Sequence, residues 1–132
     1  MSFLSRDAIL GADDFEYESV NLPEWGGEVR VRAMTAQQRA RWEGQMAEIH
    51  QSNKGFEKFG QAAIQIVVWC VVDEDGKPVF TDKDVAALGR KSSAPISRIR
   101  EVVMRLSKMG PDDVEAAEED FTETPGNDSS TD

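Results

Sequence analysis

The stretch CVVDEDGKPVFTDKDVAALGRKS, residues 70–92, lies between the two segments of the chain with the strongest helical apolar pattern. Its aspartates gather around a glycine, as they do in a calcium-binding loop: Asp73, Asp75, Asp82 and Asp84. An EF-hand needs oxygen ligands at alternate loop positions, with a glycine directly after the third of them. Counted from Asp73, the third ligand position holds Lys77 and the glycine position holds Pro78. The spacing therefore excludes an EF-hand, and we expect no metal site.

The same residues fit a turn followed by a capped helix. Asp75-Gly76 is a two-residue turn signal, because glycine adopts positive φ without steric cost. The flanking pairs Val71-Val72 and Val79-Phe80 are β-branched or aromatic, which predicts a short hairpin. Thr81 is the expected N-cap of a short helix, with Asp84 three residues later. The aspartates are thus interpreted as turn and cap residues rather than metal ligands.

Periodicity predicts the remaining elements. Residues 15–33 alternate apolar and polar side chains around turn residues, which predicts an antiparallel β-hairpin. The alternation slips at Ser19-Val20, where a β-bulge is one explanation. Three longer helices are predicted over residues 36–51, behind a Thr35–Gln38 capping box, 56–72 and 93–109. Residues 1–14 form an arm with weak helical character.

Two of these helices should build the core. The helix over residues 56–72 places on one face Phe56, Phe59, Ala63, Ile66, Val67 and Cys70, and its second half is apolar nearly all round. The last helix, with Ser93 as a candidate N-cap, repeats apolar residues at helical spacing: Ile96, Ile99, Val102, Val103, Leu106 and Met109. The fold class predicted is α+β, an N-terminal β-hairpin packed on a small bundle of about four helices.

The chain of 132 residues is expected to form one domain, and its acidity is unevenly distributed. The net charge is −10, and nine of the 25 acids follow residue 109, in a segment without lysine or arginine. We expect the domain to span residues 1–110 and a largely flexible acidic tail to span residues 111–132, beginning with a short helix through about Phe121. Such a tail disfavours nucleic acid and anionic lipid as partners. No apolar run approaches the ~20 residues of a membrane span, so no membrane partner is expected.

Catalysis and cofactor binding find no support in the residue types. His50 is the only histidine, and no serine, cysteine or paired acid stands beside it in a recognisable arrangement. Cys70 is the only cysteine and lies in an apolar run, which predicts a buried, inert thiol in a reducing cytoplasm. One histidine and one cysteine also exclude a zinc site of nitrogen and sulfur ligands. We expect no enzyme and no cofactor.

Partner binding is the remaining class of site. A basic cluster occupies nineteen residues that contain one acid: Arg90, Lys91, Arg98, Arg100, Arg105 and Lys108. It is either a solvated helix face or a docking site for an acidic partner or for the chain's own tail. Trp69 lies on the flank of its helix, where it packs against a neighbouring helix or contacts a partner. The candidate partner-binding residues are Trp69, Arg98, Arg105 and Lys108.

Several of these pieces, in this order, resemble the tail assembly chaperones of long-tailed (siphovirus-type) bacteriophages. They are CVVDEDG at 70–76, VFTD at 79–82, DV at 84–85, ALG at 87–89 and KS at 91–92. Near the start, FL at 3–4, RDAIL at 6–10 and PEWGGEVRVR at 23–32 add to the likeness. The resemblance covers most of residues 1–109.

The resemblance implies a non-catalytic role. Such chaperones act in the host cytoplasm, bind the long, aggregation-prone tape measure protein, recruit tail tube subunits and leave the finished tail. Many also have a longer, frameshifted form that binds the tube protein, and this chain would be the short form. Self-association stays open. The alternatives are a structural virion component, such as a head–tail connector or a tail-terminator-like protein, and a small regulatory or cargo-binding module unrelated to phage.

Overall fold

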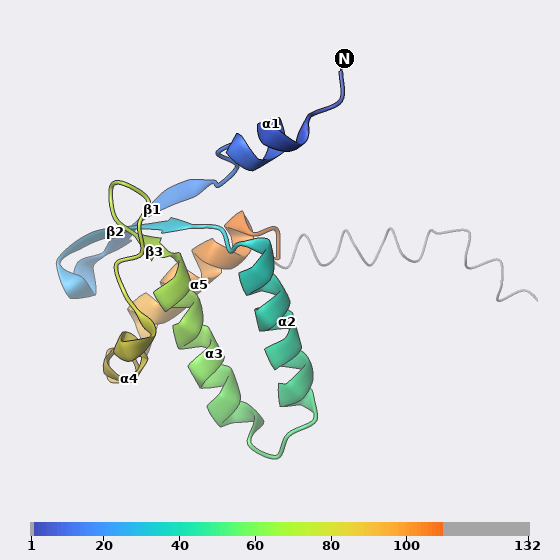
Figure 1. Ribbon diagram of the computed structural model, residues 1–132. Helices are drawn as coiled ribbons and strands as arrows, with labels where there is room; N and C mark the ends of the chain where they lie inside the picture. Colours follow the sequence, from blue (N-terminus) through green and yellow to red (C-terminus); the bar gives the residue numbers. More distant parts are fainter. Residues whose placement is uncertain (1, 110–132) are drawn as a thin grey trace, which may run out of the picture.

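An antiparallel sheet of three strands packs against a layer of helices (Figure 1). The computed structural model describes residues 2–109, and the predicted acidic tail lies outside them. The strands are β1 (Tyr17–Leu22), β2 (Gly27–Arg32) and β3 (Val71–Val72), and the helices are α1 (Arg6–Gly11), α2 (Ala36–His50), α3 (Gly55–Cys70), α4 (Val85–Leu88) and α5 (Ser93–Leu106). Short 3₁₀ turns, η1 (Pro23–Trp25) and η2 (Asp82–Asp84), follow β1 and precede α4. The predicted α+β class, a hairpin on about four helices, is confirmed.

The hairpin is regular, and a β-bulge at Ser19-Val20, one explanation of the slip in alternation, is absent. Every residue from Tyr17 to Leu22 pairs with β2 in unbroken register. The alternation slips in sequence because Glu18 shares the inner face of β1 with the buried residues Val20 and Leu22. Its carboxylate meets Arg105 of α5, 2.6 Å away, so an acid stands where an apolar residue is expected. The slip therefore marks an ion pair between sheet and helix rather than an extra residue.

The third strand, β3, pairs with a different partner from the one predicted. Val71 and Val72 pair with Val31 and Arg30 of β2, so α3 ends at Cys70 and not at residue 72. Only a single bridge, from Val72 to Pro78, remains of the hairpin predicted for this stretch. The β-branched valines lie beside an open edge of the hairpin, and pairing with it satisfies their backbone groups. The chain therefore passes from the central helix directly into the sheet.

The turn and cap interpretation of the acidic stretch is confirmed. A carboxylate oxygen of Asp73 accepts the backbone N–H groups of Asp75 and Lys77, at 2.9 and 3.0 Å. These hydrogen bonds lower the pKa of the Asp73 carboxyl, with the bond from Lys77 contributing most. Gly76 has φ of +82°, the left-handed conformation that a turn residue of this kind needs. The backbone N–H of Thr81 donates to the Asp84 carboxylate at 2.8 Å, as a cap should.

The core lies between the sheet and the helices α3 and α5. Its largest fully buried side chains are Leu22, Val31, Ile66, Val67, Val71, Pro95, Ile99 and Val103. The apolar stripe predicted for α5 is confirmed, although its N-cap is Ser92 rather than Ser93 and the helix ends at Leu106 rather than at residue 109. The capping box of Thr35 and Gln38 at the start of α2 is also present.

The first turns of α3 are more exposed than the sequence predicts. Phe56 is 97% exposed and Phe59 is 38% exposed, although both share the apolar face of this helix. Figure 1 shows why: α2 and α3 run antiparallel away from the sheet, and their joined ends extend past the other elements. Among residues 2–109, the one aromatic neighbour of Phe59 is the edge of Trp42 on α2, with the ring centroids 6.3 Å apart. Helical spacing predicts which residues share the apolar face of α3, but it does not predict how much of that face the other elements cover.

Removing side-chain volume from the core should cost stability where the same change outside it does not. Ile99→Ala empties part of a fully buried site and should lower the free energy of unfolding by about 2–5 kcal/mol. The matched control is Ile9→Ala in α1, where the isoleucine is 55% exposed and the change should stay within about 0.5 kcal/mol. Urea unfolding followed by circular dichroism measures both. An equal decrease in the free energy of unfolding for the two variants would show that Ile99 of α5 is not part of the core.

Candidate interaction surface

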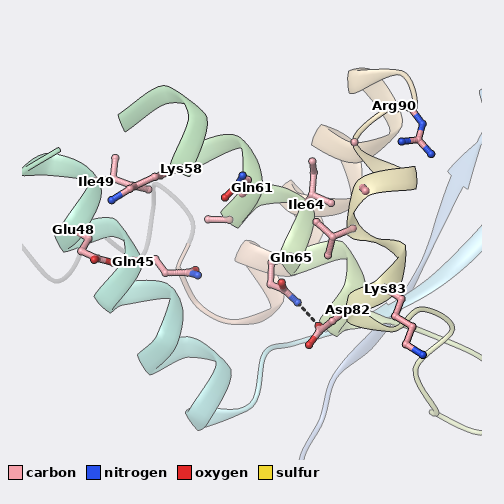
Figure 2. A pocket seen from close by; sticks show the side chains of 14 residues that line it. Gln45, Glu48, Ile49, Lys58, Gln61, Ile64, Gln65, Asp82, Lys83 and Arg90 are labelled. Carbon is pink, nitrogen blue, oxygen red and sulfur yellow. Dashed lines mark hydrogen bonds between the residues drawn. The ribbon is translucent and has the colours of Figure 1, made fainter. Parts of the chain in front are cut away.

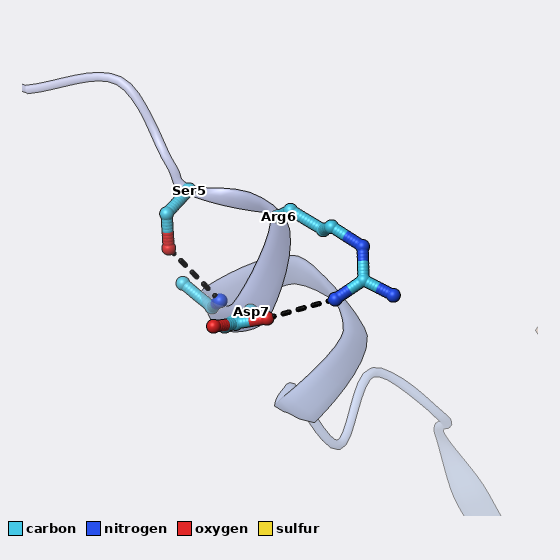
Figure 3. Close-up of polar contacts among 4 residues, drawn as sticks. Ser5, Arg6 and Asp7 are labelled. Atoms are coloured by element: carbon cyan, nitrogen blue, oxygen red, sulfur yellow. Dashed lines mark hydrogen bonds and ion pairs between the residues drawn. The ribbon is translucent and has the colours of Figure 1, made fainter.

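The N-terminal arm presents apolar side chains that the other described residues, up to Met109, leave uncovered. Helix α1 contains no buried residue, and the exposed apolar side chains of the arm are Phe3, Leu4, Ile9 and Leu10. The helix begins at a cap, where the Ala8 N–H donates to the Ser5 hydroxyl at 3.1 Å, beside an ion pair of Arg6 and Asp7 (Figure 3). A helix of six residues is too short to be stable by itself in water. The arm therefore has the composition of a segment whose apolar side chains become buried when a partner binds.

A hollow of about 750 Å³ separates α2 from α3 and α4 (Figure 2). Its floor is apolar, with Ile49, Ala62, Ile64, Val85 and Ala86, and its rim has charges of both signs, with Glu48, Lys58, Asp82, Lys83 and Arg90. Gln65 of α3 lines it and donates to the Asp82 carboxylate at 3.0 Å. The side-chain oxygen of Gln45 is buried and accepts no hydrogen bond within residues 2–109. The mixture suits a polar protein surface better than an ion or a nucleotide.

A second hollow, of about 230 Å³, lies between α3, α4 and the first turns of α5, and is named here the α3–α5 hollow. Its apolar lining consists of Phe59, Ala63, Ile64, Leu88 and Ile96. Lys91 and Arg100 line it as well, and no acid does so among the described residues. The guanidinium carbon of Arg100 lies 5.4 Å from the centroid of the Phe59 ring, a cation–π distance. This hollow is apolar inside and basic at its edge.

Two of the predicted partner-binding arginines are engaged within the chain. Arg98 donates two hydrogen bonds to the Glu24 carboxylate, at 2.9 and 3.0 Å. Arg105 donates two to the Glu18 carboxylate, at 3.0 and 2.6 Å. Both pairs join α5 to the hairpin in the bidentate geometry that arginine favours. They position α5 across the sheet, and a role for these arginines in partner binding stays a prediction.

The other two predicted residues lie elsewhere. Trp69 is half-buried at the end of α3, packs against the core and has the guanidinium of Arg41 from α2 at 5.9 Å from its ring. Lys108 follows α5, is exposed and has a positive φ of 60°. The structure therefore brings Arg98 and Arg105 together against the hairpin, while Trp69 faces α2. The carboxylates that engage the arginines were missed in the sequence, because nothing in it shows that α5 crosses the hairpin.

The ion pairs lower the pKa of both hairpin carboxyls. The hydrogen bonds from Arg98 hold the pKa of Glu24 at about 2, against an ordinary 4.5, and those from Arg105 lower the pKa of Glu18. A carboxyl with a lowered pKa stabilises the fold at pH values above its ordinary pKa, and this stabilisation is lost as the pH falls toward the lowered value. Because both pairs are partly exposed, solvent and salt screen them.

Removing the arginine should restore the ordinary titration of its partner. Arg98→Gln should raise the pKa of Glu24 from about 2 toward 4.5, measured by NMR on the carboxyl carbon across an acid titration. The control Arg100→Gln changes the charge equally, two residues away, and should leave the pKa of Glu24 low. A Glu24 carboxyl that titrates near 4.5 in the unmodified protein would contradict the ion pair.

Cys70 and His50, the residue types most often used in catalysis and metal binding, lie apart from each other. Cys70 is fully buried, as predicted, and burial raises the pKa of its thiol to about 12. His50 lies exposed at the end of α2. Within residues 2–109, no three histidine, cysteine, aspartate or glutamate side chains gather as a metal site requires. The helices of this part of the chain are all too short or too polar to cross a membrane.

Comparison with known proteins places these features in a family. The family model described as "Phage tail assembly chaperone" matches residues 5–120, which run from the cap of α1 into the predicted acidic tail. The fold is similar to the solved structure of the bacteriophage HK97 tail assembly chaperone, with a TM-score of 0.58 over 78% of this chain and 91% of that chain. The two sequences are 20% identical, so this likeness concerns the fold. No curated protein matches the chain in sequence.

Proposed function

The chain belongs to the phage tail assembly chaperone family, and from that premise we propose that it binds the tape measure protein of its phage while the tail is assembled. The role is non-catalytic. The protein acts in the cytoplasm of the infected host, recruits tail tube subunits to the complex and leaves before the tail is complete. The alternative of a structural virion component has no observation in its favour that the chaperone role does not explain as well.

The observation that supports client binding is the uncovered arm. Exposed apolar side chains scattered singly are normal in soluble proteins, but the arm gathers four of them, two just before α1 and two within it, and α1 has no buried residue. A tape measure protein is long and prone to aggregate, so it offers apolar segments that such an arm can cover. Ordering of the arm then accompanies binding and reduces the net affinity, which suits a chaperone that must later release its client.

The hollows and charges of the helical layer supply further contacts for the client. Trp69, Arg98, Arg105 and Lys108 stay proposed partner contacts, and the two arginines would have to exchange Glu24 and Glu18 for client carboxylates. Recruitment of tube subunits is direct or passes through a frameshifted longer form, as the family resemblance implies.

A polar residue in the arm should weaken client binding without weakening the fold. Leu10 is 68% exposed, so Leu10→Ser should leave the melting temperature unchanged while lowering the yield of soluble tape measure protein on co-expression. The measurement is the amount of tape measure protein that co-purifies with the tagged chain. Val79→Ser serves as the matched control, because Val79 is 52% exposed and lies far along the sequence from the arm.

Two results would count against this function. One is a failure of the unmodified chain to co-purify with, or to solubilise, the tape measure protein encoded with it. The other is an equal loss for Leu10→Ser and Val79→Ser, which would show that the arm has no special part in binding.

A further inference from the structure

The α3–α5 hollow stands out because its positive charges have no partner within residues 2–109. The ion pairs of this part of the chain occupy Arg6, Arg39, Arg98 and Arg105. They leave out Lys91 and Arg100 at the hollow, as well as Arg90 beside it. Of the six residues of the basic cluster, Arg98 and Arg105 are therefore neutralised by the hairpin, whereas Lys91 and Arg100 line an apolar hollow.

The chain contains a segment whose chemistry matches this hollow. Residues 111–121 read PDDVEAAEEDF, with six acids and no base. Three apolar residues, Val114, Ala117 and Phe121, follow one another at intervals of three and four, the spacing that gathers side chains on one helical face. Apolar residues flanked by acids are complementary to an apolar hollow with a basic edge. The family match also runs through residue 120 and so includes most of this segment.

The connection is long enough for the segment to reach its own hollow. Arg100 lies six residues before the end of α5, which corresponds to ~9 Å along the helix. The dozen residues from 110 to 121 span up to ~40 Å when extended, so they can turn back along α5 even in a more compact form. A tethered segment also binds at a high effective concentration, which favours it over a separate molecule with the same contacts.

The size of the hollow argues for a side chain as its occupant. Its volume of about 230 Å³ is below the roughly 300–1,000 Å³ of typical small-molecule sites. An aromatic side chain such as Phe121 would lie against Phe59, Leu88 and Ile96, which line it. The neighbouring acids would then stand near the ammonium of Lys91 and the guanidinium of Arg100.

We propose that residues 111–121 dock on the α3–α5 hollow of their own chain, with Phe121 inside it and the acids toward Lys91 and Arg100. The docked segment covers an apolar, basic surface that would otherwise attract acidic proteins in the host cell. Because its charges are exposed, its occupancy falls as salt screens them. The docking itself does not depend on the proposed function, so either can fail without the other.

The test uses the full chain with a spin label beside Phe121. The label is attached to Thr122→Cys, because the native thiol of Cys70 is fully buried with a raised pKa and does not compete for the reagent. Amide peaks of the hollow, such as those of Gly60, Leu88 and Ser97, should lose intensity when the label is paramagnetic. High salt should restore them.

A matched pair of charge reversals separates docking from general electrostatics. Lys91→Glu should restore the intensity of the hollow peaks, whereas Lys54→Glu, the same change in the loop between α2 and α3, should not. If the hollow peaks keep full intensity in spin-labelled Thr122→Cys with no charge reversal, the proposal is overturned. Equal effects of the two reversals would overturn it as well. A final control mixes two kinds of chain at the same total concentration: one with the spin label but no ¹⁵N, the other with ¹⁵N but no spin label. A loss of hollow peak intensity in this mixture would also overturn the proposal, since the occupant would then be the tail of a second copy.

Discussion

The guanidinium of Arg32 joins the sheet to the helices α2 and α3. Its residue is only 8% exposed, and no acid pairs with it among residues 2–109. A buried charge is costly unless hydrogen bonds satisfy it, and Arg32 donates to the carbonyl oxygens of Ala33 and Trp69 at 2.8 and 3.0 Å. A longer bond of 3.4 Å reaches the side chain of Gln38, which also accepts the N–H of Thr35 in the cap of α2. One side chain therefore ties β2, the start of α2 and the end of α3.

This contact explains where α3 ends. The last four carbonyls of a helix have no partner within it, and the negative end of the helix dipole lies there, so a cation is stabilised at that point. Arg32 occupies this position at Trp69, and the chain continues as β3 along the edge of β2. With α2 and α3 fixed to the sheet at one end, their opposite ends extend into solvent and expose Phe56 (Figure 1). The surfaces left for partners are the ends and edges that this anchoring does not cover.

The parts of the fold that depend on local sequence could be predicted, and those that depend on a distant segment could not. The capping box at Thr35 and the turn at Gly76 each need only neighbouring residues, and both are present as expected. Strand β3 has two residues, too few for any periodicity, and it exists only because β2 lies beside it. Glu18 breaks the alternation of β1 for a reason found on α5.

The candidate site divides in the same way. The basic cluster and Trp69 were visible in the sequence. The division of the cluster into two arginines held by the hairpin and two bases that line the α3–α5 hollow depends on how α5 crosses the sheet, which the sequence does not show. The apolar residues of the arm were visible as well. Their exposure was not visible, because an apolar helix is normally interpreted as part of the core. Only the packed structure shows that no other part of residues 2–109 buries α1.

Under the proposed function, α1 becomes stably packed only when the tape measure protein is bound. Hydrogen exchange of the chain, alone and in complex with the tape measure protein, tests it directly. Alone, the amides of Arg6–Gly11 should exchange at nearly unfolded rates, because a helix of six residues without buried side chains opens freely. In the complex they should be protected, while the amides of β1, β2 and α5 keep the rates they have in the free chain. Unchanged exchange in α1 within a formed complex would contradict the proposal that the arm binds the tape measure protein.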